Sequence, residues 1–112
     1  MILSFDEYQQ RTALTAIYPG QGSIEGLLYT GLGLGEAGEI QGKIKKIMRD
    51  DNNHVTDDKR IAIAKELGDL LWYVSQTSTE LGLSLEQIAI DNLAKLVSRQ
   101  ERGVLQGNGD DR

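Results

Sequence analysis

Two pairs of acidic residues are the part of this sequence best suited to chemistry: Glu36 with Glu39, and Glu66 with Asp69. The members of each pair are three positions apart, so on a helix they share one face and lie about one turn apart. Four carboxylates that face one another across two helices need a cation, because unpaired buried charges are costly. An all-oxygen ligand set without His or Cys selects a hard ion such as Mg²⁺ or Mn²⁺. The spacing therefore predicts a metal site, and the chemistry it implies is metal-assisted attack of water on a phosphate ester or anhydride.

The surroundings of these acids weigh against the ordinary alternative, an acidic stripe that faces solvent. Glu66 has Ile63 one turn before it and Leu70 one turn after it, so it interrupts an apolar face. Neither Glu66 nor Glu36 has a Lys or Arg three or four positions away that could neutralise it on the same helix. We therefore favour the metal site over the solvated stripe.

Four helices are expected to position these residues, and capping signals mark their ends. Ser4 and Ser84 each begin a capping box, and Thr56 precedes an acidic first turn. Gly82 and Gly103 are suited to end the two later helices. The predicted helices run over about residues 5–17, 24–49, 57–81 and 85–102. The fold class is therefore all-α, a small bundle of about four helices, with residues 1–103 as one domain and 104–112 as a flexible tail.

The composition limits the classes of function that remain. The chain has 112 residues, with 17 acidic against 12 basic side chains, a net charge of −5 and no cysteine. The acidic balance argues against a nucleic-acid scaffold, and the lack of cysteine excludes disulfides, thiolate zinc sites and cysteine nucleophiles. No signal segment or membrane-spanning apolar run is present, so we expect a cytoplasmic protein with no membrane partner. Because one domain of this size is small, a pocket that encloses a whole ligand is expected to need a second subunit.

Three other motifs are better explained without a further function. Residues 33–38 match the glycine-rich dinucleotide-binding fingerprint, but no strands follow to build the parallel sheet which that motif needs. The acidic stretch 51–58 lacks the central Gly and the final Glu of a calcium loop. His54 stands alone in a polar loop, and the Glu-x-x-His pairs of di-iron bundles are missing. We set these three interpretations aside.

The acidic pairs and their flanking residues resemble the MazG-like nucleotide pyrophosphohydrolases. The resemblance runs from Gly31 to Asp110, and it is carried by Gly31-Leu32, Gly35-Glu36-Ala37-Gly38-Glu39, Glu66-Leu67-Gly68-Asp69-Leu70-Leu71-Trp72-Tyr73, Asn92-Leu93, Lys95-Leu96, Arg99 and Arg102-Gly103. The resemblance implies an all-α enzyme that uses Mg²⁺ and cleaves nucleoside triphosphates between the α and β phosphates. The products would be a nucleoside monophosphate and pyrophosphate, and the role would be removal of non-standard or surplus nucleotides.

The resemblance also implies roles for single residues. It makes Glu36, Glu39, Glu66 and Asp69 the metal ligands and catalytic acids, one of which serves as, or orients, the base for the attacking water. The substrate-binding positions that it implies are Tyr73, Asn92, Lys95 and Arg99, with Tyr73 beside the nucleotide and Asn92 and Lys95 on the sugar and phosphates. The competing interpretations are a core tyrosine for Tyr73 and a solvated helix end for Lys95 and Arg99.

Members of the family commonly form dimers or dimers of dimers, so the resemblance implies a homodimer or homotetramer. Where members that prefer dCTP carry aromatic and His residues near the start of the chain, this sequence has Gln10, Arg11 and Tyr18, which leaves the base open. Two other functions stay in consideration. One is a phosphoribosyl-ATP pyrophosphohydrolase, which shares the fold and the chemistry; the other is a non-catalytic, metal-binding dimerisation module.

Overall fold

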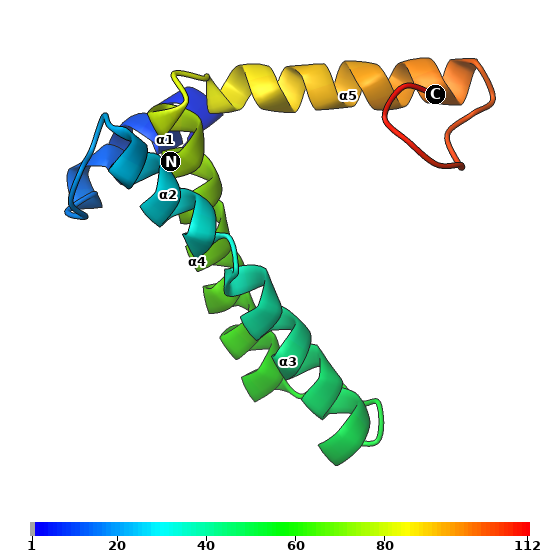
Figure 1. Ribbon diagram of the computed structural model, residues 1–112. Helices are drawn as coiled ribbons and strands as arrows, with labels where there is room; N and C mark the ends of the chain where they lie inside the picture. The colour runs from blue at the N-terminus through cyan, green and yellow to red at the C-terminus, as the bar shows by residue number, and fades with distance from the viewer. Residues whose placement is uncertain (1) are drawn as a thin grey trace.

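The computed structural model describes residues 2–112, and within that range it is helical without strands (Figure 1). Its elements are α1 (Phe5–Thr12), a short 3₁₀ helix η1 (Ala13–Thr15), α2 (Ile24–Gly33), α3 (Glu36–Asp50), α4 (Asp57–Glu80) and α5 (Leu85–Glu101). The predicted caps form: the side chains of Ser4, Thr56 and Ser84 each accept a hydrogen bond from the backbone three residues later. The all-α class is confirmed.

The stretch predicted as one helix over residues 24–49 is divided into α2 and α3. At the joint, the amides of Leu34 and Gly35 bond to carbonyls three residues back, which is 3₁₀ geometry and tightens the chain. A β-carbon on Gly33 would lie 2.2 Å from ring carbons of Tyr73, so the chain passes this ring only because residue 33 is glycine. The joint therefore lies where the chain crosses α4, and it places Glu36 in the first turn of a new helix.

Helix α4 is the central helix, and the other α-helices all contact it. Helix α3 packs antiparallel beside its first half, while α1 and α2 lie against its second half (Figure 1). Helix α5 contacts α1 and α4 near its own start and then extends away from them alone. Helices α1, α2 and α3 are therefore organised around α4, and α5 joins this packing only near its own start.

The most deeply buried side chains at the junction of α1, α2 and α4 are polar. The Thr12 hydroxyl lies 2.7 Å from Oε1 of Gln76, whose Nε2 donates to the Tyr18 hydroxyl at 3.1 Å. Tyr18 in turn donates to Oε1 of Glu80 at 2.5 Å, and Oε2 of Glu80 accepts from the backbone N–H of Gly22 at 2.9 Å. This connected network ties the loop before α2 to α4 and satisfies groups that would be costly to bury unpaired.

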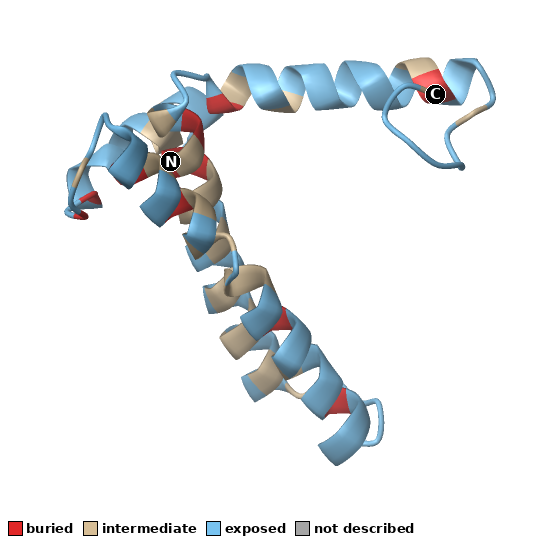
Figure 2. Ribbon diagram, in the orientation of Figure 1, coloured by how far each residue is buried: buried red, intermediate tan, exposed pale blue. Residues whose placement is uncertain are grey.

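The single chain is far from compact. Its radius of gyration is 17.0 Å, whereas a compact chain of this length has about 13 Å. Its accessible surface is 8071 Å², roughly 1,900 Å² more than a compact monomer of this mass exposes. Along α5 this surface includes the apolar side chains of Ile90, Leu93 and Val97, and Figure 2 shows that helix exposed over most of its length.

The segment 104–112, predicted to be a flexible tail, folds back on the end of α5 in this structure. Arg99, which is 4% exposed, donates to the backbone carbonyl of Asp110 at 2.9 Å. The Asp110 carboxylate lies 3.3 Å from both Arg99 and Lys95. Arg112 donates from Nε to the carbonyl of Val104 at 3.0 Å. The flexibility of this segment and the boundary at residue 103 stay predictions.

Candidate functional site

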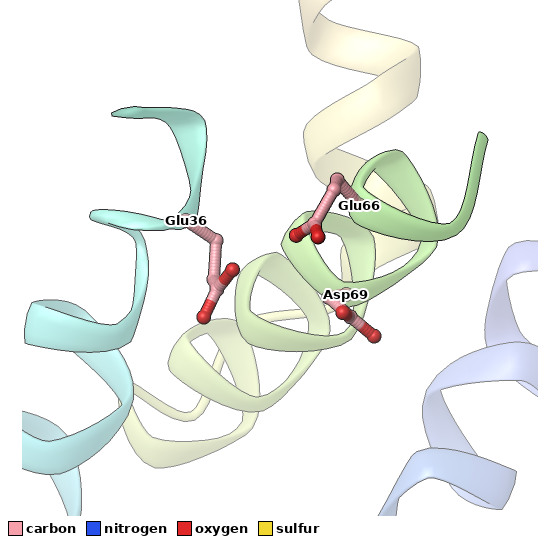
Figure 3. A group of neighbouring side chains, drawn as sticks. All are labelled: Glu36, Glu66 and Asp69. Atoms are coloured by element: carbon pink, nitrogen blue, oxygen red, sulfur yellow. The ribbon is translucent and has the colours of Figure 1, made fainter. Parts of the chain in front are cut away.

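Three of the four predicted acids converge between α3 and α4. Glu36 comes from the first turn of α3, and Glu66 and Asp69 come from the middle of α4 (Figure 3). One carboxylate oxygen from each lies within 4.8 Å of the others. Glu66 and Asp69 share a face of α4 because they are three residues apart, and the packing of α3 beside α4 brings Glu36 to them. The arrangement offers an all-oxygen ligand set, which suits a hard divalent cation.

Glu39 is not among the acids that converge. It lies in the first turn of α3, one turn beyond Glu36, and its side chain is exposed. The structure therefore places three of the four predicted ligands together, and the role of Glu39 as a fourth stays a prediction.

The charge of the three acids is only partly balanced within the chain. Lys43 of α3 places Nζ 3.8 Å from Oε1 of Glu66. Burial and the neighbouring carboxylates of Glu66, Glu39 and Asp69 raise the pKa of Glu36 above its ordinary value. A group of like charges that raises the pKa of one member is a group that a cation would stabilise.

A pocket of about 400 Å³ opens beside the acids, lined by Thr15, Glu36, Asp69, Trp72 and Tyr73. Its volume lies in the range of small-molecule sites in proteins. One part of the wall carries carboxylates, and the remainder carries two aromatic rings and a hydroxyl. The predicted substrate residue Tyr73 therefore does adjoin the acids, with its ring packed against Gly33.

The other predicted substrate residues are not brought to this pocket within one chain. Asn92 and Lys95 line a separate hollow of about 310 Å³ on α5, together with Ile88 and Asp91. Arg99 lies farther along the same helix and is covered by the segment 104–112. Since α5 extends away from the α3–α4 pair (Figure 1), these three residues are remote from the acids of their own chain.

Sequence reasoning missed three residues of the site. Lys43 is four positions from Glu39 on the same helix, but it approaches Glu66 on the neighbouring helix. Trp72 belongs to the family motif without a role of its own, although it lines the pocket. Thr15 comes from η1, far away in the sequence, and no local pattern marks it.

Comparison with known proteins places the chain in a family. No solved structure matches it. It is 50% identical over 111 residues to the Gene 37 protein of Mycobacterium phage L5, a match that spans 96% of this chain and 97% of that protein. Among the described residues, no helix is both long enough and apolar enough to cross a membrane. The model of the MazG nucleotide pyrophosphohydrolase domain matches residues 28–104, a stretch that holds all four predicted acids and the whole of α5. The chain therefore belongs to the MazG nucleotide pyrophosphohydrolase family.

Proposed function

We propose that the protein is a Mg²⁺-dependent nucleoside triphosphate pyrophosphohydrolase that cleaves its substrate between the α and β phosphates. The observation that carries this proposal is the convergence of Glu36, Glu66 and Asp69 at the wall of a pocket of about 400 Å³. A site that presents three carboxylates repels a polyphosphate unless a cation lies between them, so acids and pocket together favour a metal–nucleotide substrate. Membership in the family supports the same reaction class.

In this proposal the acids bind the metal and activate the attacking water. Glu36, Glu66 and Asp69 would hold Mg²⁺, with Mn²⁺ as a substitute. Glu39, one turn beyond Glu36 on α3, would be the fourth ligand. The bound ion supplies charge neutralisation at the phosphates and a more acidic water. One of these carboxylates accepts a proton from the attacking water while the water oxygen bonds to phosphorus. The bond from that phosphorus to the bridging oxygen breaks, which releases the monophosphate and pyrophosphate.

We further propose that the enzyme acts as a homodimer or a dimer of dimers. The chain exposes roughly 1,900 Å² more than a compact monomer, which exceeds the ~800 Å² per partner of a standard interface. The apolar side chains of α5 contribute to this excess. Packing of α5 on a second copy, with Asp110 displaced from Lys95 and Arg99, would also carry these two residues toward acids from which they are remote in their own chain. The biological role that we propose is removal of surplus or non-standard nucleotides in the cytoplasm.

The test is pyrophosphate release from a panel of nucleoside triphosphates, deoxynucleoside triphosphates and phosphoribosyl-ATP, with Mg²⁺ and with EDTA. We expect Mg²⁺-dependent release from simple nucleotides, its loss in Glu66→Gln, and its retention in the matched control Glu101→Gln at the exposed end of α5. Turnover of phosphoribosyl-ATP alone would replace the proposal by the second enzyme function. Stabilisation by Mg²⁺ with no turnover of any nucleotide would leave a metal-binding module.

A further inference from the structure

The aromatic part of the pocket wall has no role in the reaction described above. The acids Glu36 and Asp69 occupy one side of the pocket, and Trp72 and Tyr73 follow Asp69 by three and four positions along α4. These spacings place the aromatic residues about one helical turn from Asp69, on the same side of the helix. A ligand whose phosphates lie at the acids therefore has its remaining part directed along a wall of aromatic rings.

The indole of Trp72 is held in place by one hydrogen bond and two ring contacts. Its Nε1 donates to Oγ1 of Thr15 at 2.8 Å, and its ring lies nearly perpendicular to the rings of Tyr73 and Tyr18, at centroid distances of 5.2 and 6.2 Å. Tyr18 is itself stacked on Tyr29 at 5.1 Å, with ring planes 15° apart. Tyr18 is 6% exposed and belongs to the core, whereas Trp72 is only half-buried and lines the pocket. The cluster thus holds one large aromatic ring in a fixed position at the edge of the pocket.

We propose that Trp72 is the residue that contacts the nucleobase, and that Thr15 is a positioning residue that orients its indole. This inference rests on the proposed function and extends that function by assigning the part of the site that binds the base. Stacking on an aromatic ring accepts any base, because every base has a π-face. The Thr15 hydroxyl is already engaged by Trp72 and by the backbone carbonyl of Thr12 at 3.1 Å. The substrate class is therefore nucleotides with any of the common bases, with purines favoured over pyrimidines for their larger stacking surface.

The two parts of the site come from different parts of the chain. The acids and Trp72 lie within residues 28–104, which match the family, whereas Thr15 lies in the preceding segment. The position of the base-contacting ring thus depends on a residue outside the matched stretch. Variants of Thr15 are expected to alter nucleotide affinity while leaving the metal site intact.

The direct test uses the fact that Trp72 is the single tryptophan of the chain. The probes are a non-hydrolysable nucleoside triphosphate analogue and inorganic tripolyphosphate, each with Mg²⁺, and binding of each is measured in parallel by calorimetry. We expect the nucleotide to quench the tryptophan fluorescence saturably and tripolyphosphate to bind with little change. Nucleotide binding without quenching, or equal quenching by both probes, would overturn the inference alone. Absence of binding by both probes would overturn the proposed function and this inference with it.

Variants separate base contact from a structural role. Trp72→Leu is expected to raise KM for nucleotides about 5- to 150-fold, the range for loss of one stacked base, with kcat and the inhibition constant of tripolyphosphate unchanged. Trp72→Phe keeps a ring and should lose less. Thr15→Val is expected to raise the KM for nucleotides with unchanged kcat. Thr15→Ser keeps the hydroxyl, so its KM should stay close to that of the wild type. An equal rise for nucleotide and tripolyphosphate in Trp72→Leu, in protein of unchanged melting temperature, would contradict base contact. A fall in melting temperature with loss of kcat in both Trp72 variants would instead assign the ring to the core.

Discussion

The middle of α4 and the outer part of α5 differ in charge and in packing. The middle of α4 carries acids and is covered by α3, so its three carboxylates meet within one chain. The outer part of α5 carries Lys95 and Arg99 and exposes apolar side chains, and within residues 2–112 it packs only against the segment that follows it. Proteins bind polyphosphates through metal ions held by acids and through direct contacts with Lys or Arg. Under the proposed function, one chain assembles the metal half of the site, and a second copy would complete the phosphate half.

Removing one acid should give the largest effect, because it breaks the half of the site that the chain assembles alone. Asp69→Asn keeps the size of the side chain and removes a charged ligand. We expect Mg²⁺-dependent pyrophosphate release to fall by about 10³-fold, since a catalytic metal supplies several kcal/mol. Steady-state kinetics at saturating Mg²⁺ measure this, and a variant with nearly full activity would place the reaction elsewhere.

Mixing two inactive variants tests whether the two halves come from different chains. Suppose that each site of a dimer takes its acids from one chain and its cations from the other. After equal mixing of Asp69→Asn and Lys95→Ala, about half of the dimers contain one chain of each variant, and one of the two sites in such a dimer carries neither substitution. About one quarter of all sites are then intact, and activity returns in that proportion. The measurement is activity of the mixture after subunit exchange, against each variant alone. If both halves of a site belong to one chain, no activity returns on mixing.

The contrast between these two regions was only partly predictable from the sequence. Caps and periodicity predict the helices, and a spacing of three predicts that Glu66 and Asp69 share a face. Gly33, next to the break at Leu34, lies against the Tyr73 ring of another helix, and the pairing of Lys43 with Glu66 crosses between helices. Such contacts are set by tertiary packing, which local patterns do not contain. For the same reason, no periodic pattern shows that α5 leaves the bundle.

A substitution at the joint between α2 and α3 would disturb the packing beside the pocket without touching α5. Gly33→Ala places a methyl group 2.2 Å from the Tyr73 ring, so the ring or the helix must move. We expect a loss of about 1–3 kcal/mol in the free energy of unfolding, the usual cost of overpacking. Gly31→Ala is the matched control, because nothing lies near its β-carbon position. Denaturant unfolding of both variants measures the difference, and equal stability would contradict the close packing of Tyr73.

The smallest effect concerns the charge of Glu36 in metal-free protein. Burial and nearby carboxylates raise its pKa, so its ionised form destabilises the fold above the ordinary pKa of a glutamate, about 4.3. Stability is therefore gained as the pH falls through the raised pKa. Glu36→Gln removes the charge and should slightly raise the melting temperature at pH 8 in EDTA, with no gain at pH 4. The same variant should lose most of the stabilisation by Mg²⁺, and a lower melting temperature in EDTA would contradict the crowding of like charges.

The central claim is that Glu36, Glu66 and Asp69 together hold a cation, and calorimetric titration of Mg²⁺ into metal-free protein tests it most directly. The wild type and the control Glu101→Gln should bind Mg²⁺ saturably, and Asp69→Asn should lose most of this affinity. The same binding isotherm for Asp69→Asn and the wild type, or no binding by the wild type, would contradict the claim.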